Sequence, residues 1–237
     1  MLPQAKENAV QSQNGQQVLR TTTGEFPLHE YRFSSGWHEW SILHIDAMLT
    51  AEDEQRFFRE LRERLPYGVA LWPASIALAH ELARRAEALR GGRLLELGAG
   101  TGLPGIVAAT LGAQVVQTDG HAVALHLCRR NGQRNHARAI EYRQADWASW
   151  NDETRYEWIV GADSLYCESL HPHLREIFEH NLAPGGRVLL ADPFREIGLK
   201  LLEGLEKSGW SVRLSKWSVG EDAAPRAIGI YELAPPP

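Results

Sequence analysis

The sequence predicts an α/β fold in which helices cover both faces of a mostly parallel sheet. The main observation is a regular alternation of strand-like and helix-like segments that begins near residue 93 and continues almost to the end of the chain. A second observation is a glycine-rich turn directly after the first of these strands. Alternation of this kind produces parallel strands joined by crossover helices. Ligands of such folds bind beyond the carboxyl ends of the strands, so the predicted site residues are sought there.

The bulk composition is that of an ordinary globular protein. The chain has 237 residues, of which 43% are hydrophobic and 23% are charged, and its net charge is -5. No basic footprint is evident, which weakens nucleic acid as a substrate.

Cys128 and Cys167 form neither a disulfide framework nor a zinc spacing, which favours a reducing compartment. No signal peptide or membrane-spanning run is recognisable, so we expect a cytoplasmic protein. The sequence does not indicate an oligomeric state.

The N-terminal part of the chain predicts a short extension ahead of the alternating segments. Residues 1–22 are rich in Gln, Asn and Thr and predict a disordered tail. Residues 31–45 have the β-rich character of a hairpin with a turn near Ser35. We therefore expect residues 23–70 to form an extension of hairpin and helix, and residues 71–237 to form the main domain.

The helix of this extension begins at Thr50. Asp53 follows three residues later, which is the spacing of a capping box with Asp in place of the usual Glu. Apolar residues at helical spacing predict the stripe that this helix buries, namely Phe58, Leu61 and Leu65.

The elements of the main domain follow from local hydrophobic patterns. Strands are predicted where apolar and β-branched residues form short runs, at residues 93–97, 113–118, 140–143, 158–162, 187–191, 210–219 and 227–233. Helices are predicted where apolar residues recur at helical spacing, at residues 73–89, 103–111, 122–135, 170–178 and 197–205.

The glycine-rich turn has the sequence ELGAGTGLPG over residues 96–105. Glycines let the backbone turn tightly and approach a ligand closely. A dinucleotide fingerprint would place a glycine at position 103, where Leu103 stands, so a dehydrogenase is disfavoured. A pyrophosphate prefers a helix N-terminus, whereas Glu96 offers an acid to an ammonium group. S-adenosylmethionine (SAM) carries such a group and no phosphate. The alternative is a glycine-rich turn that binds nothing.

Three further residues follow the second and third strands. Asp119 stands 21 positions after Gly98, where a carboxylate can accept both hydroxyls of a ribose. A helix N-cap is the alternative role. Asp146 can accept from an adenine amino group, and the indole of Trp147 can lie on the ring face. A core or rim aromatic is the alternative for Trp147, and Trp72 has the same ambiguity.

Asp163 and Tyr166 follow the fourth strand, where a methyl acceptor should lie. An amine acceptor must lose a proton before it attacks, because the pKa of a lysine is about 10.4. Asp163 can orient the amine or assist this proton loss, and Tyr166 can hydrogen-bond and narrow the pocket. Positioning of the amine against the methyl donor should supply much of the rate of methyl transfer. The alternative is a surface Asp and a packed Tyr.

His171 and His173 lack a third ligand, so no metal site is predicted.

These motifs resemble those of the class I, seven-stranded SAM-dependent methyltransferases. Within that class the chain is similar to the methyltransferase-like protein-lysine methyltransferases (family 16) and to bacterial nicotinamide-N-methyltransferase-like proteins. The resemblance covers about residues 30–233. Besides the glycine motif, it is carried by LWPAS over residues 71–75, by Asp146 with Trp147, and by the D-x-x-Y motif from Asp163 to Tyr166.

The resemblance implies a Rossmann-like sheet with strand order 3-2-1-4-5-7-6 and an antiparallel last strand. It also implies SAM as the cofactor, held by Trp72, Gly98, Ala99, Gly100, Asp119, Trp147 and Ala162. Gly102, Glu96 and Asp146 complete the predicted cofactor-binding set.

The function implied is methyl transfer to an amine, with a protein lysine as the first hypothesis. Cys167 stands where many lysine-modifying members carry Glu. A small-molecule methyltransferase acting on a pyridine or amine therefore stays open. So does a protein with the SAM-binding fold that binds a partner without catalysis.

Overall fold

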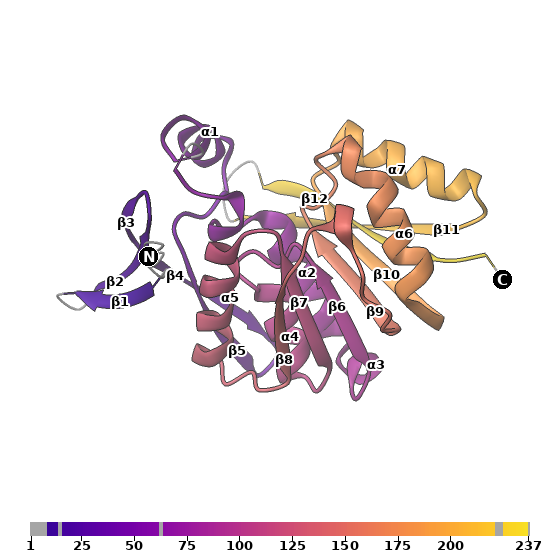
Figure 1. The fold of residues 1–237 in the computed structure, drawn as a ribbon, viewed down its shortest axis with the longest axis horizontal. Helices are drawn as coiled ribbons and strands as arrows, with labels where there is room; N and C mark the ends of the chain where they lie inside the picture. Colours follow the sequence, from indigo (N-terminus) through magenta and orange to yellow (C-terminus); the bar gives the residue numbers. More distant parts are fainter. Residues whose placement is uncertain (1–8, 14–15, 62–63, 221–224, 237) are drawn as a thin grey trace, which may run out of the picture.

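The computed structural model describes residues 9–13, 16–61, 64–220 and 225–236. A seven-stranded sheet forms the centre of the molecule (Figure 1). In spatial order its strands are β11 (Ser211–Val219), β12 (Arg226–Ala234), β10 (Leu182–Asp192), β9 (Tyr156–Ala162), β6 (Arg93–Leu97), β7 (Gln114–Asp119) and β8 (Ile140–Gln144). β12 runs antiparallel to both neighbours, and the remaining neighbours pair in parallel. Counted from residue 93, this order is the predicted 3-2-1-4-5-7-6, so the predicted fold class is confirmed.

Helices cover both faces of this sheet. Those of the main domain are α2 (Pro73–Arg84), α3 (Ala86–Leu89), α4 (Leu103–Thr110), α5 (Ala122–Arg134), α6 (His171–Asn181) and α7 (Glu196–Lys207). Side chains alternate between the faces of a strand, so Leu94 packs with α2 and α4, and Leu95 packs with α6 and α7. The helix predicted over residues 73–89 is interrupted at Arg85 and forms two helices. Among the described residues, no helix combines the length and apolarity needed to span a bilayer.

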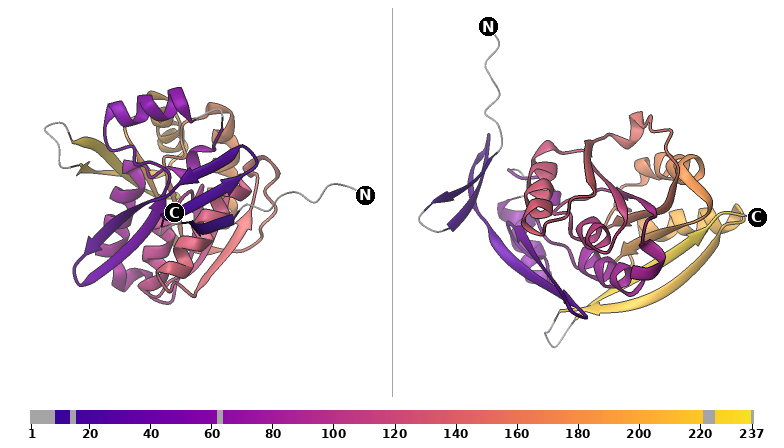
Figure 2. Two further views of the ribbon diagram at one scale, coloured as in Figure 1. Left: turned by 90° about the vertical axis from the view of Figure 1, so that its left-hand side faces the viewer. Right: turned by 90° about the horizontal axis from the view of Figure 1, so that it is seen from below.

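The N-terminal extension consists of a small sheet, a hairpin, a helix and a short helical turn. β1 (Ala9–Gln13), β2 (Gln16–Thr21) and β3 (Gly24–Pro27) form an antiparallel sheet, and β4 (His29–Ser35) pairs with β5 (His38–His44). The predicted hairpin is therefore present. The small sheet lies on the side of the molecule opposite β11 and β12 (Figure 2).

The small sheet corrects the prediction of a disordered tail over residues 1–22, since β1 and β2 lie within that range. Residues 1–8 and 14–15 lie outside the described residues. Val18 is buried, and Leu19 is buried together with Phe26 in a small apolar cluster that also includes a side chain of α5. A few apolar side chains with a tertiary partner thus order a segment whose composition is mostly polar.

Two asparagines, Asn131 of α5 and the C-cap residue Asn135, hold the hairpin against the main domain. Asn131 accepts a hydrogen bond from the Leu43 backbone N–H at 2.8 Å and donates to the Leu43 carbonyl at 2.9 Å. Asn135 makes the same pair of bonds with Ser41, both at 2.8 Å. Asn131 also donates to the carbonyl of Thr101 at 2.9 Å. The side chain of Asn131 therefore ties the extension to the glycine-rich turn.

The extension continues with α1 (Ala51–Glu60) and the short helical turn η1 (Tyr67–Val69). The predicted capping box at Thr50 and Asp53 is present. The predicted apolar stripe is partly wrong, because Phe57 is fully buried whereas Phe58 is 39% exposed. Phe57 packs against Met48 and the segment after η1. Adjacent phenylalanines point about 100° apart on a helix, and only the position of the main domain decides which one is buried.

Gly105 of α4 lies against the buried side chains of Glu96 and Gln117. A Cβ at position 105 would contact the Glu96 carboxylate and lie 2.5 Å from Gln117 Nε2. We expect Gly105→Ala to destabilise the fold by roughly 1–3 kcal/mol, although alanine is the better helix former. Urea denaturation measures the change.

Gly204 of α7 provides the control, because nothing lies within 4 Å of a Cβ at that position. Gly204→Ala should stabilise the fold by about 0.5–1 kcal/mol. If both substitutions stabilised the protein, the packing described for Gly105 would be incorrect.

Candidate functional site

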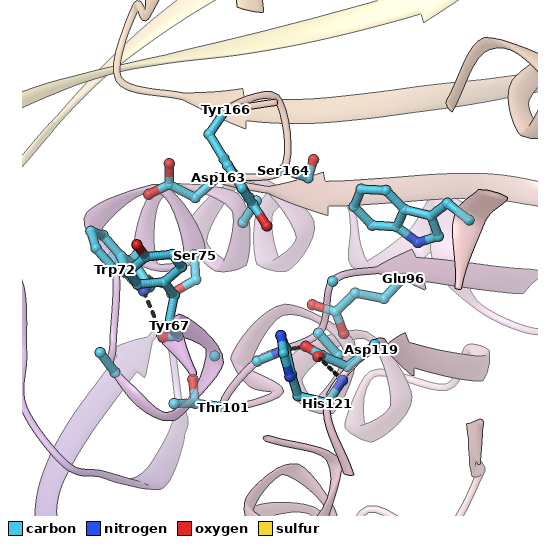
Figure 3. A pocket seen from close by; sticks show the side chains of 18 of the residues that line it. Tyr67, Trp72, Ser75, Glu96, Thr101, Asp119, His121, Asp163, Ser164 and Tyr166 are labelled. Atoms are coloured by element: carbon cyan, nitrogen blue, oxygen red, sulfur yellow. Dashed lines mark hydrogen bonds between the residues drawn. The ribbon is translucent and has the colours of Figure 1, made fainter. Parts of the chain in front are cut away.

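A cavity of about 370 Å³ lies beyond the carboxyl ends of β6, β7, β8 and β9 (Figure 3). Its volume is within the range of small-molecule sites. All the predicted site residues except Gly102 line it, namely Trp72, Glu96, Gly98, Ala99, Gly100, Asp119, Asp146, Trp147, Ala162, Asp163 and Tyr166. Their convergence follows from the topology, because parallel strands end at the same edge of a sheet. The structure places these residues together, and their roles stay predictions.

The glycine-rich turn forms a left-handed bend on one wall. Gly98, Gly100 and Gly102 have φ values of 69°, 55° and 88°, which favour glycine. Gly102 does not line the cavity and instead precedes α4 as its N-cap residue. The indole of Trp147 faces the bend, since a Cβ on Gly98 would lie 3.6 Å from its Cζ2. Asp146 is exposed and accepts from the Ala148 N–H at 3.0 Å, which caps the short turn η2 (Trp147–Ser149).

Asp119 holds the bend through hydrogen bonds to the backbone. Its Oδ2 accepts from the Gly100 N–H at 3.0 Å, and its Oδ1 accepts from the His121 N–H at 2.9 Å. The N-cap of α5 is His121 rather than Asp119. Burial raises the pKa of Asp119, and the two backbone donors oppose that rise. Each carboxylate oxygen has a further lone pair, so the group can still accept from a ligand.

Glu96 is a buried acid at the base of the cavity, with 1% exposure. Its Oε2 accepts from Gln117 Nε2 at 2.6 Å and from the Gly105 N–H at 3.1 Å. Among the described residues, no basic side chain forms an ion pair with it. Burial raises the pKa of Glu96 to about 8. An ammonium group in the cavity would supply the missing cation and favour the ionised acid.

The stability of the protein should fall as the pH rises, because Glu96 holds a proton in the folded state. Its folded pKa of about 8 lies above the ordinary value of 4.5. Between these values the folded protein holds a proton that the unfolded chain releases. The stability from this group is thus fully present below pH 4.5 and is lost as the pH rises through about 8. In urea titrations, the unfolding free energy of the wild type should fall more steeply with pH than that of Glu96→Gln.

Glu81→Gln is the control for this comparison, because Glu81 is buried but paired with Arg85 at 2.8 Å. That variant should keep the steeper fall of the wild type. Equal slopes for the wild type and Glu96→Gln would mean that Glu96 is ionised in the folded protein.

Asp163 lies across the cavity from Asp119 (Figure 3). It forms an ion pair with Arg195, which does not line the cavity. Arg195 also reaches Asp192 Oδ2 at 3.2 Å. Burial raises the pKa of Asp163, and the guanidinium of Arg195 opposes that rise. Arg195 escaped the sequence analysis because it follows the fifth strand, 32 positions from Asp163. In the sequence, the segment Asp-Pro-Phe over residues 192–194 is the feature that points to this part of the site.

Aromatic side chains border the outer part of the cavity. The lining residues Tyr67, Trp72 and Tyr166, together with Phe58, which packs against Tyr67 outside the lining, are called the aromatic rim. The Tyr67 ring lies 5.7 Å from that of Phe58, 6.3 Å from that of Trp72 and 6.4 Å from that of Tyr166, all edge to face. The Trp72 indole donates to the Tyr67 carbonyl at 3.0 Å. Tyr166 is 52% exposed and Tyr67 is 38% exposed, so the rim faces solvent.

The extension contacts the glycine bend without any side chain between them. A Cβ on Gly100 would lie 3.2 Å from the Gly68 carbonyl oxygen, so η1 rests directly on the bend. From the sequence, Gly68 with Pro66 predicts only the end of the helix that begins at Thr50. Other lining residues that the sequence does not indicate are Tyr67, Ala70, Ser75, Thr101, Gly120, His121, Ala145, Ser164 and Leu170. Ser75, Thr101 and Ser164 lie within the quoted motifs but have side chains without an evident role there, and the others belong to no motif, so only the folded topology brings them to the cavity.

Comparison with known proteins gives a consistent result. A family model described as lysine methyltransferase matches residues 51–198. Protein N-lysine methyltransferase METTL21A of Danio rerio is 37% identical over 135 residues, which cover 54% of this chain and 61% of that protein. Histone-arginine methyltransferase METTL23 of Xenopus laevis is 32% identical over 123 residues, covering 48% of this chain and 53% of that protein. The chain thus spans between half and two thirds of these relatives.

Among solved structures, the T. Thermophilus 16S rRNA N2 G1207 methyltransferase, in complex with AdoMet and guanosine, has a similar fold. Its TM-score is 0.60 at 20% identity, and the match covers 88% of this chain and 50% of that one. At this identity the likeness concerns the fold.

Proposed function

This chain belongs to the lysine methyltransferase family, and on that premise we propose that it transfers a methyl group from SAM to the side-chain amine of a lysine in a protein. The observation that carries the proposal is the arrangement of acids in one cavity. Glu96 and Asp119 lie beside the glycine bend, and Asp163 and Tyr166 lie across from them.

The residues beside the glycine bend fit SAM. The buried Glu96 has no basic partner in the described part of the chain and would take the ammonium group of the amino-acid part. Asp119 retains lone pairs for the ribose hydroxyls, and Trp147 offers its indole to the adenine. SAM, when bound, supplies an electrophilic methyl group on a sulfonium. The protein then has to place an amine in line with that group.

Asp163 and Tyr166 act on the acceptor. An incoming lysine is a cation at neutral pH, and the aromatic rim can stabilise it through cation–π contacts as it enters. The carboxylate of Asp163 accepts a hydrogen bond from the ammonium group and fixes its position. Once the amine has released a proton to solvent, the same carboxylate orients its lone pair toward the methyl group. The hydroxyl of Tyr166 narrows the space around the nitrogen.

The solvent-facing rim favours a protein acceptor over a small amine. Tyr67 and Tyr166 are both partly exposed, and Phe58 of the rim is 39% exposed, so a side chain on another protein can reach the cavity. A closed site around a small molecule would bury these rings. Both cysteines are free thiols, which supports a reducing, cytoplasmic location.

The proposal is tested by incubating the protein with methyl-tritiated SAM and a lysate of its source organism. Labelled protein is then hydrolysed and its methylated amino acids are separated. We expect the label in methyl-lysine. Label in methyl-arginine would mean that the acceptor is an arginine and not a lysine. Label in the small-molecule fraction would favour the small-amine alternative. Absence of transfer to either fraction would refute the proposed function.

A further inference from the structure

The inference concerns the arginine that contacts Asp163. Asp163 directly follows β9 and has a φ of 57°, a conformation that is uncommon for residues other than glycine. Its backbone N–H donates to the Ala191 carbonyl of β10 at 2.9 Å. The backbone of the neighbouring strand thus fixes the position from which the carboxylate extends into the cavity.

The segment after β10 folds back to bring Arg195 to this carboxylate. The Arg195 N–H donates to Asp192 Oδ1 at 2.7 Å, and its guanidinium bridges Asp163 and Asp192. Phe194, next to it, also has a positive φ, of 63°. The side chains of Asp163 and Asp192 are only 10% and 2% exposed, while that of Arg195 is 28% exposed. The bridge therefore joins two buried acids to one partly buried cation.

Four titratable or charged groups face Asp163. These are Arg195, Asp192, Glu54 and Tyr166. Glu54 of α1 is already paired with Arg226 at 2.7 Å. Among the described residues, Arg195 is thus the cation in direct contact with Asp163. If it were removed, a buried carboxylate would lie beside a second one and would take up a proton.

We propose that Arg195 is a positioning residue, which keeps Asp163 ionised and aimed at the incoming amine. With both carboxyl groups ionised, the two acids and one guanidinium would leave a single negative charge at this end of the cavity. The ammonium group of a lysine would balance it, so the same cluster selects a cationic acceptor. The catalytic consequence rests on the proposed function, whereas the ionisation of Asp163 can be measured without any methyl transfer.

The first test is a ¹³C NMR titration of protein labelled at its aspartate carboxyl carbons. The Asp163 resonance is assigned by its loss in Asp163→Asn. In Arg195→Met its midpoint should move upward by about one pH unit or more, and Arg195→Lys should restore most of the difference. An unchanged midpoint in Arg195→Met would overturn the proposal.

Arg85 provides a matched control for this titration. Its side chain is 27% exposed and bridges two carboxylates, Glu81 at 2.8 Å and Glu232 at 2.7 Å, outside the cavity lining. Arg85→Met removes a comparable ion-pair network and should leave the Asp163 midpoint in place. A shift of equal size in both variants would mean that general loosening of the fold moves the midpoint, which would also overturn the proposal.

The second test is the pH profile of methyl transfer. The acidic limb of kcat/KM should move to higher pH in Arg195→Met and to lower pH in Asp192→Asn, which removes the competing carboxylate. The stabilisation of the protein by SAM should persist in both variants. A wild type without transfer would refute the proposed function and leave the NMR result to decide on Arg195. If the wild type is active and the acidic limb of both variants lies at the same pH as that of the wild type, the role of Arg195 alone would be refuted.

Discussion

Asp119→Ala is expected to lose most of the thermal stabilisation that SAM gives to the wild-type protein. A ligand at 100 times its dissociation constant adds about 2.7 kcal/mol to the unfolding free energy, which corresponds to a Tm rise of about 5–10 °C for a chain of this size. The substitution removes the acceptor for the N–H groups of Gly100 and His121, so the bend loses its support. It also removes the proposed acceptor for the ribose hydroxyls. Thermal unfolding with and without SAM measures both effects.

Asp152→Ala is the matched control. Asp152 is buried and accepts from the Thr154 N–H at 3.0 Å and from the Tyr156 hydroxyl at 2.6 Å, but it does not line the cavity. Its loss should lower the Tm of the free protein and leave the increment from SAM intact. If SAM raised the Tm of Asp119→Ala as much as that of the wild type, the glycine bend would not be part of the cofactor site.

Asp163→Ala should lower methyl transfer by about 100-fold or more and leave SAM binding unchanged. The substitution removes the group that we propose to fix the acceptor amine, and loss of such a positioned side chain typically costs 10²–10⁴-fold. Asp163 lies across the cavity from Asp119 and makes no hydrogen bond to the glycine bend among the described contacts. The measurement is single-turnover transfer from labelled SAM, together with the Tm increment from SAM.

Glu81→Ala controls for the loss of a buried acid paired with an arginine, because Glu81 contacts Arg85 at 2.8 Å and does not line the cavity. It should retain the wild-type rate at temperatures where it is folded. If Asp163→Ala transferred methyl groups at the wild-type rate, the acceptor would have to be held by other residues. If it lost SAM binding as well, Asp163 would belong to the cofactor site.

Much of the main domain could be predicted because its local signals agree with the fold. The first strand was predicted at residues 93–97, which are the bounds of β6. The strand order came from a family resemblance rather than from periodicity. The small N-terminal sheet was missed because its stability depends on tertiary burial of Val18 and Leu19, which a polar local composition conceals. The buried face of α1 was ambiguous for a related reason, since Phe57 and Phe58 are adjacent.

The candidate site could be predicted where its residues follow strands of the parallel sheet. Glu96, Asp119 and Asp163 are acids at or just after strand ends, and a common sheet edge brings them together. Tyr67 and Arg195 could not be found in this way. Tyr67 lies in a short turn of the extension, and Arg195 follows a strand whose proximity to Asp163 depends on the pairing of β9 with β10.

The contact of Gly68 with Gly100 has a mechanical consequence. The two backbones touch without an intervening side chain that could rotate aside, since a Cβ on Gly100 would lie 3.4 Å from the Gly68 Cα. Tyr67 precedes Gly68 on one side of this contact, and Asp119 accepts from the Gly100 N–H on the other. A side chain added at either glycine would therefore have to push the two backbones apart, which would move the turn that carries Tyr67 away from the bend.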